Sequence, residues 1–203
     1  TADLEPGFYE SDALNYINNL VPQYLNSNMT KAYSGKAQQF MASSGTMGGI
    51  LALSFIFIYL VLAAQFRSFI DPFIVILAVP LSMVGGLFAL KMVGGTLNLY
   101  ADIGIVTLIG LISKHGILIT QFINDLRHDG IQLPEAIIQG AATRLRPILM
   151  TTAAMVFGTL PLALSSGPGS IGRHDIGWVI VGGLCFGTLF SLFVVPLAYS
   201  FLG

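Results

Sequence analysis

The stretch LNLYADIGIVTLIGLISKHGILITQFIND, residues 97–125, decides the fold of this chain. It is long and apolar, and Lys114 lies near its middle. About twenty apolar residues in an α-helix span a bilayer. A cation inside such a span costs roughly 3 kcal/mol or more unless it is paired or reaches water. We therefore expect a transmembrane helix in which Lys114 has a functional partner.

The chain offers Lys114 no carboxylate at contact distance. Asp102 lies ~18 Å away along the helix axis and on another face, and Asp125 shares the face of Lys114 but lies ~16 Å away. The other acids of the membrane part fall in predicted connections between spans: Asp71, Asp129, Glu135 and Asp175. Unless the lysine snorkels, its partner comes from another helix or polypeptide.

Snorkelling is the simpler alternative, since the lysine stem could carry the ammonium ~6 Å toward the membrane boundary. Against it, Ser113 and His115 flank Lys114, and Gly110 one turn earlier would let another backbone approach that face. These neighbours favour a buried polar seam over a lipid-facing surface.

The composition indicates a membrane protein. Hydrophobic residues make up 54% of the chain and charged residues 9%, against about 25% charged in an ordinary soluble domain. The net charge of −1 and the absence of a long basic run give no reason to expect nucleic acid as a partner. Cys185 is alone in an apolar segment, where a packing role is expected. No signal peptide or initiator methionine is recognisable at Thr1, so we expect a segment of a longer protein.

The apolar runs predict an all-α membrane fold with five transmembrane helices, at about residues 46–65, 69–90, 97–124, 148–164 and 176–201. One more helix, from Pro134, is expected to lie along the membrane surface. Pro147 disfavours helix at the preceding residue and marks the entry of the fourth span. Gly183 and Gly187 have the small-xxx-small spacing of close helix contacts.

Residues 1–43 are polar enough to be soluble. The pattern from Ser11 to Leu20 predicts a short helix, and a weak alternation between Asn26 and Phe40 predicts an edge strand. So short a piece buries too little apolar surface to fold alone. We interpret residues 1–43 as a small α/β remnant of a larger domain, and residues 44–203 as the transmembrane domain.

The distribution of basic residues predicts the orientation. One side of the membrane carries Arg67, Arg127, Arg144 and Arg146, and the other carries Lys91 and Arg173. The positive-inside rule places the connection after Asp125 in the cytoplasm and the N-terminal piece outside.

Enzymatic chemistry finds no support in the motifs. GPGSIG at residues 167–172 matches G-x-G-x-x-G, but a dinucleotide fingerprint needs a strand before it and a helix on a sheet after it. His115, His128 and His174 are too dispersed for a metal site, and no cysteine joins them. Ser113 with His115 lacks the elbow and the third member of a hydrolase. We expect no enzyme, no metal and no cofactor.

The stronger constellation joins Lys114 to Arg144, Thr151 and Thr152. Arg144 and Thr151 are two helical turns apart if the helix continues through Pro147, so both could line the cytoplasmic end of one polar path. Separately, Arg144 could be an interfacial anchor and Thr151 a hydroxyl bonded to its own backbone. Together with an unpaired intramembrane lysine, they indicate a proton or ion relay.

Four runs carry a family resemblance: YLVLAAQFRSF, GLISKHGILITQFINDL, RLRPILMTTAAMVFGTLPLALSSGPGS and LFVVPLAYSFL. They resemble the last five transmembrane helices of a resistance-nodulation-division efflux pump of the hydrophobe/amphiphile, multidrug branch, and the resemblance covers essentially the whole chain. It implies a homotrimeric drug/proton antiporter of the bacterial inner membrane that works with a periplasmic adaptor and an outer-membrane channel. Residues 1–43 would end its periplasmic porter domain.

The resemblance also implies roles for single residues. Lys114 matches the lysine that pairs with two adjacent aspartates on a helix in the first half of such a pump, and Arg144 and Thr151 match its other relay residues. Gln121, on the face of Lys114, and Thr152 are further candidates for the proton pathway. Asp102 stands where the family more often has a neutral polar residue, and belongs to a proton entrance or faces external water.

Two alternatives stay open. A lipid-export or protein-export relative of the same fold would share these features, and a structural membrane module without transport activity would share the spans. The SKHG run differs from the acidic pattern of the heavy-metal branch, which argues against metal export. An acidic pair on a helix of the missing half would separate a transporter from a scaffold.

Overall fold

The computed structural model describes residues 14, 16–21, 32–35, 38, 47–167 and 170–202. Residues 16–21 are helical, and no described residue is in a strand. Most of the predicted α/β remnant at residues 1–43, including much of the predicted edge strand, lies outside the described residues, as do two positions of the GPGSIG run, Pro168 and Gly169.

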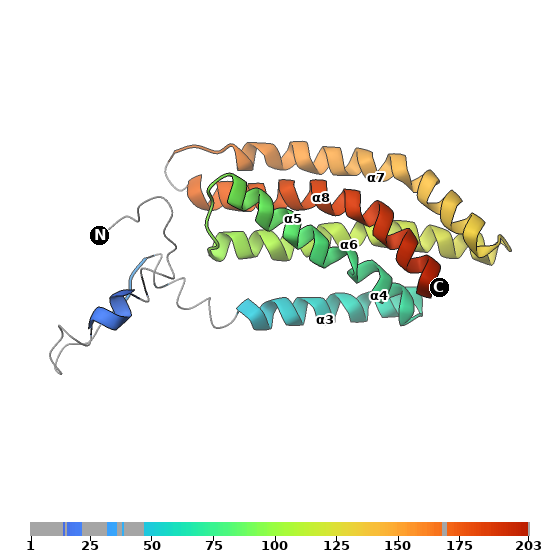
Figure 1. Ribbon diagram of the computed structural model, residues 1–203, viewed down its shortest axis with the longest axis horizontal. Coiled ribbons are helices and arrows are strands. Elements are labelled where there is room, and N and C mark those ends of the chain that lie inside the picture. The colour runs from blue at the N-terminus through green and yellow to red at the C-terminus, as the bar shows by residue number, and fades with distance from the viewer. Residues whose placement is uncertain are drawn as a thin grey trace.

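The rest of the described chain forms the helices α3 (Met47–Phe66), α4 (Ile70–Ile76), α5 (Ala78–Met92), α6 (Leu99–His128), α7 (Leu133–Ala163) and α8 (Ser170–Leu202). They run up and down as an elongated bundle (Figure 1). Five stretches of the described chain are long and apolar enough to cross a membrane, with α4 and α5 together forming the second, Ile70–Met92. The prediction of an all-helical fold with five spans is thus confirmed for the described residues.

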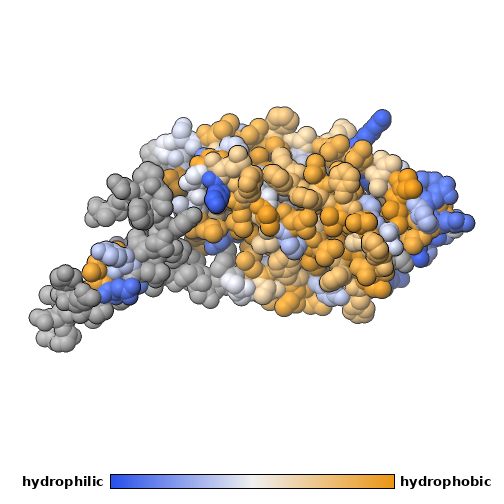
Figure 2. Space-filling model, viewed as in Figure 1, coloured by the Kyte–Doolittle hydropathy of each residue, from blue (hydrophilic) through white to orange (hydrophobic). Residues whose placement is uncertain are grey.

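The helix order gives the bundle two distinct ends. The α3–α4 turn, the α6–α7 turn and the end of α8 lie at one end, and the α5–α6 and α7–α8 connections at the other (Figure 1). Hydrophobic residues cover most of the flank in view, whereas hydrophilic residues gather at the α6–α7 turn (Figure 2). The exposed Arg127, His128 and Asp129 belong to this turn. We refer to this end of the bundle as the α6–α7 end.

Helix α8 lies at the centre of the packing, because it contacts α5, α6 and α7. Small residues allow the close approach: Gly183 meets Leu108 and Gly187 meets Ile112, both on α6. The predicted close contact at these glycines is confirmed. By contrast α3 keeps many large apolar side chains exposed, among them Leu53, Phe57 and Leu60.

The second span is broken at Leu77, between α4 and α5. Pro80 lies one turn later and has no backbone N–H, so the carbonyl of Ile76 loses its usual helical donor. The N–H of Leu77 still reaches the carbonyl of Phe73 at 3.1 Å. The backbone therefore stays hydrogen-bonded at the break, and the two short helices together form one candidate span.

The prediction of a separate surface helix ending before Pro147 is wrong. Instead α7 continues from Leu133 to Ala163 through Pro147 and Pro161. A proline removes one donor, but its φ suits a helix, and neighbouring helices offset the loss in membrane proteins. The fully buried Ile148 holds this part of α7 against the bundle. The fourth candidate span is Leu133–Ala163, which begins well before residue 148, and the fifth is Ser170–Leu202.

Two buried carboxylates connect helices near the ends of the bundle. At the α6–α7 end, Asp71 accepts a 2.9 Å hydrogen bond from Nδ2 of Asn124, whose Oδ1 accepts one from the hydroxyl of Tyr199. At the other end, Oδ2 of Asp175 accepts a 2.5 Å bond from Nδ2 of Asn98, whose Oδ1 caps α6. Both acids were expected in connections between spans, but they lie inside α4 and α8. Donors on neighbouring helices satisfy them there.

A substitution at Gly177 tests how closely α7 and α8 approach each other. A Cβ at Gly177 would lie 2.4 Å from the backbone nitrogen of Ala163 and 2.5 Å from its Cα. Gly177→Ala should force the helices apart and lower the free energy of unfolding by roughly 1–3 kcal/mol, seen as a lower thermal midpoint of circular dichroism in detergent. Gly49→Ala meets nothing within 4 Å and, as the control, should not lower the midpoint. Equal midpoints for the two variants would contradict this packing.

Asn124 tests the connection at the α6–α7 end. Asn124→Leu leaves the Asp71 carboxylate buried without its amide donor, which should lower the free energy of unfolding by roughly 1–3 kcal/mol. The double variant Asp71→Ala with Asn124→Leu removes both partners, so it should lose less stability than the sum of the two single losses. Chemical unfolding in mixed micelles measures all three. Strictly additive losses would show that the bond contributes nothing.

Candidate functional site

Lys114 lies at the middle of α6 and faces away from the bundle. Its side chain is exposed, as are Thr107, Gly110 and Gln121, which share its face at helical spacing. The opposite face of α6 is buried against α5, α7 and α8. We call the exposed set Thr107, Gly110, Lys114 and Gln121 the α6 polar face.

Lys114 forms no ion pair with any described residue. Asp102 is half-buried in the first turn of α6, and Asp125 is exposed near the last turn. Nδ1 of His174 lies 3.6 Å from Oδ1 of Asp175 near the start of α8. The ammonium therefore sits near the middle of a candidate membrane span, on an uncovered face, without an ion-pair partner in the described chain.

Arg144 packs on α6 rather than reaching toward Lys114. Its guanidinium carbon lies 4.5 Å from the centre of the Phe122 ring, a cation–π contact of about 0.5–2 kcal/mol. Its Nε is buried and has no hydrogen-bond partner among the described residues. Arg144 therefore attaches α7 to α6 while keeping unused donor capacity.

Thr151 and Thr152 differ in their surroundings. Thr151 is half-buried and donates to the carbonyl of Ile148 at 3.0 Å, within its own helix. Thr152 is buried, and its hydroxyl lies 3.4 Å from Nε2 of His115 on α6. This contact sets the register of the antiparallel pair, because it joins the residue after Thr151 to the residue after Lys114.

The register brings some of the predicted site residues to one level and leaves others apart. Lys114 and Thr151 lie at the same height of the bundle, whereas Arg144 lies ~10 Å from Thr151 toward the α6–α7 end. Gln121 lies ~10 Å from Lys114 in the same direction, and Asp102 lies ~18 Å away in the other. The candidate residues are thus spread along the axes of α6 and α7 and do not form a compact pocket.

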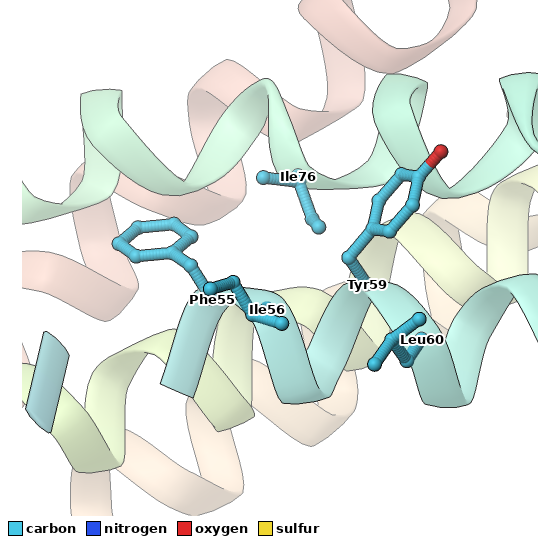
Figure 3. Close-up of a pocket in the computed structure, with 5 residues that line it drawn as sticks. All are labelled: Phe55, Ile56, Tyr59, Leu60 and Ile76. Atoms are coloured by element: carbon cyan, nitrogen blue, oxygen red, sulfur yellow. The ribbon is translucent and has the colours of Figure 1, made fainter. Parts of the chain in front are cut away.

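The candidate residues line neither the groove between α3 and α4 nor a second, more polar hollow beside Asn124, Arg127 and His128 on α6. Figure 3 shows an open groove between α3 and α4, lined by Phe55, Ile56, Tyr59, Leu60 and Ile76. Its one polar group, the hydroxyl of Tyr59, donates to the carbonyl of Phe69 at 3.1 Å. No three described His, Cys, Asp or Glu residues are placed to hold a metal ion.

Two polar groups were not expected from the sequence. In one, Asn124 is hydrogen-bonded to both Asp71 and Tyr199. In the other, His115 contacts the hydroxyls of Thr152 on α7 and Thr188 on α8. Each group takes single polar residues from helices far apart in the sequence, so periodicity within one helix could not reveal it. The available signal was a polar residue in the apolar part of each span.

The sequence matches the AcrB/AcrD/AcrF family over residues 1–203. An uncharacterized transporter of Haemophilus influenzae is 41% identical over 204 residues, which cover 97% of this chain and 20% of that protein. The toluene efflux pump membrane transporter TtgB of Pseudomonas putida is 34% identical over 194 residues, covering 96% of this chain and 18% of that protein. Multidrug resistance protein MdtC of Escherichia coli is 36% identical over 176 residues, 86% of this chain and 17% of that protein.

The chain spans about a fifth of the length of these relatives. Its five candidate spans agree with a multi-pass membrane protein. The match covers the α6 polar face and all the helices described above, and the family is one of transporters rather than enzymes. This chain therefore belongs to the AcrB/AcrD/AcrF family of resistance-nodulation-division efflux transporters, and is similar to the C-terminal region of multidrug efflux pumps.

Proposed function

We propose that this chain forms the second membrane half of a drug/proton antiporter that exports hydrophobic and amphiphilic compounds, driven by the proton-motive force. The observation that carries the proposal is Lys114, a full cation at the centre of a membrane-length helix, exposed and without an ion pair to any described residue. Such a charge indicates a functional site. The relatives named for toluene efflux and multidrug resistance suggest the class of compound.

The counter-charge in this proposal lies outside the chain. Because the chain spans about a fifth of its relatives' length, a longer protein has room for another membrane half with two adjacent aspartates opposite the α6 polar face. Gly110 supports this arrangement, since nothing lies within 4 Å of the position of a Cβ there. Another helix can therefore approach Lys114 closely.

The proposed cycle is electrostatic. Ionised aspartates hold the ammonium of Lys114 between them, because opposite charges attract strongly where water is scarce. A proton arriving from outside neutralises a carboxylate and releases the ammonium, and the helices then repack. That movement is passed to the periplasmic porter domain, of which residues 1–43 form the end.

The other candidates extend the proton path along α6 and α7. Thr151 stands at the level of Lys114, and Arg144 lies further toward the α6–α7 end, where its buried Nε could bind water or a carboxylate. Thr152 and Gln121 line the same stretch. Asp102, in the first turn of α6, stands at the entrance.

The positive-inside rule supports the orientation that the cycle needs. Arg67 and Arg127 lie at the α6–α7 end and Arg144 and Arg146 in the half of α7 toward it, whereas Lys91 and Arg173 lie toward the other end. We therefore place the α6–α7 end and the C-terminus in the cytoplasm and residues 1–43 in the periplasm. In this proposal the protein is a homotrimer in the bacterial inner membrane, surrounded by the lipid bilayer. It works with a periplasmic adaptor and an outer-membrane channel, and without nucleic acid.

Replacing Lys114 tests the proposal. In the longer protein that carries this segment, Lys114→Ala should reduce proton-driven efflux of a fluorescent amphiphile about tenfold or more, because the ionised carboxylates then lose their cation. Protein level and trimer formation should stay unchanged. Lys91→Ala, which removes an exposed lysine at the end of α5, is the matched control and should export normally. Wild-type efflux by Lys114→Ala would contradict the proposed function.

A further inference from the structure

Three polar side chains meet in the apolar interior of the bundle, one each from α6, α7 and α8. His115 is fully buried, and Thr152 and Thr188 are nearly so. One turn away on their helices lie Ile112 and Ile148, both buried in the core. The function proposed above gives no role to His115 or Thr188. We call the three side chains the His115 cluster.

Both ring nitrogens of His115 have a hydroxyl partner. Nε2 lies 3.4 Å from Oγ1 of Thr152, and Nδ1 lies 3.4 Å from Oγ1 of Thr188. The two hydroxyl oxygens are 3.1 Å apart, and Thr152 also donates to the carbonyl of Ile148 at 2.9 Å. One side chain of α6 therefore bridges α7 and α8.

A neutral imidazole satisfies this arrangement. With its proton on Nε2, the ring donates to the oxygen of Thr152 and accepts the hydroxyl proton of Thr188 at Nδ1. Thr152 remains free to give its own proton to the carbonyl of Ile148. Each donor then has an acceptor, which is the condition for burying polar groups in an apolar core.

No described carboxylate pairs with the ring of His115. Lys114 is the preceding residue, so a charged imidazole would place a second cation at the same level of α6. On α6, Asp102 and Asp125 are ~15–20 Å away along the axis. On α4 and α8, Asp71 and Asp175 are held near opposite ends of α6 by other partners. On α7, Arg144 faces Phe122.

We propose that His115 is a positioning residue, whose neutral side chain fixes α6 against α7 and α8 and so sets the height and direction of Lys114 relative to Thr151. This inference rests on the proposed function, because Lys114 must meet a partner at a defined place. Successive helix residues point ~100° apart, so holding His115 inward directs Lys114 outward. A rotation or shift of α6 that withdrew Lys114 would break both contacts of the imidazole.

The neighbouring positions make the coupling direct. His115 follows Lys114 on α6, and Thr152 follows Thr151 on α7, so one hydrogen-bonded pair sets the spacing of the other. An apolar ring at position 115 need not unfold the helices, because threonine hydroxyls can bond to carbonyls of their own helix, as Thr152 already does. Loss of position can therefore be separated from loss of fold.

The test compares an apolar and an amide replacement in the longer protein. We expect His115→Phe to reduce efflux about tenfold and to raise the pH of half-maximal efflux, since an ammonium drawn away from the carboxylates no longer opposes their protonation. His115→Gln keeps a donor and an acceptor, and should retain at least about half of the efflux with the wild-type pH profile. Thr188→Val removes one of the two contacts of the imidazole, so its efflux should lie between that of His115→Phe and that of His115→Gln.

Thr159→Val is the matched control, because the Thr159 hydroxyl donates to carbonyls of its own helix at 3.0 and 3.1 Å. It should export normally. Wild-type efflux by His115→Phe, or a loss that follows protein level with an unchanged pH profile, would overturn the positioning role. So would a His115→Gln protein as inactive as His115→Phe, because the imidazole itself would then carry the proton. Lys114→Ala, measured in parallel, separates the two proposals. Normal efflux by Lys114→Ala would reject the proposed function, whatever the result for the His115 variants.

Discussion

The proposed function depends on one electrostatic constraint, a lysine ammonium at the middle of a helix long enough to cross a membrane. The helices of this chain bury the opposite face of α6 and leave Lys114 exposed, without an ion pair to any described residue. A cation at that depth requires a counter-charge or water. In the proposed function, a counter-charge from another helix offsets the energetic cost of this position.

The two faces of α6 have complementary tasks in this account. Outward, Gly110 leaves open space beside Lys114, so that another helix can approach. Inward, His115 contacts hydroxyls on two other helices. We propose that this polar contact in the packed core holds α6 in place, so that Lys114 on the other face meets its partner at a defined position. Gly183 and Gly187 support this by letting α8 pack directly on α6.

The sequence predicted well what depends on composition and periodicity within a single helix. Apolar length predicted the five candidate spans, and the spacing of Gly183 and Gly187 predicted a close helix contact. The sequence-based predictions were wrong where contacts with neighbouring helices determine the local structure. Pro147 was expected to end a helix, but packing of Ile148 keeps α7 continuous. Asp71 and Asp175 were placed in connections, although Asn124 and Asn98 let them lie inside helices. The candidate site residues could be named from the sequence. The register of α6 against α7, which brings Thr151 to the level of Lys114, follows only from the structure.

The most direct measurement is the surroundings of position 114 in the membrane. With Cys185 replaced by serine, a nitroxide spin label at Lys114→Cys in the longer protein reports whether oxygen dissolved in lipid reaches it. We expect low oxygen access at this position if another helix covers the α6 polar face as proposed, and higher access in this segment reconstituted alone. Equal and high oxygen access in both would mean that Lys114 faces lipid, and would contradict the central claim.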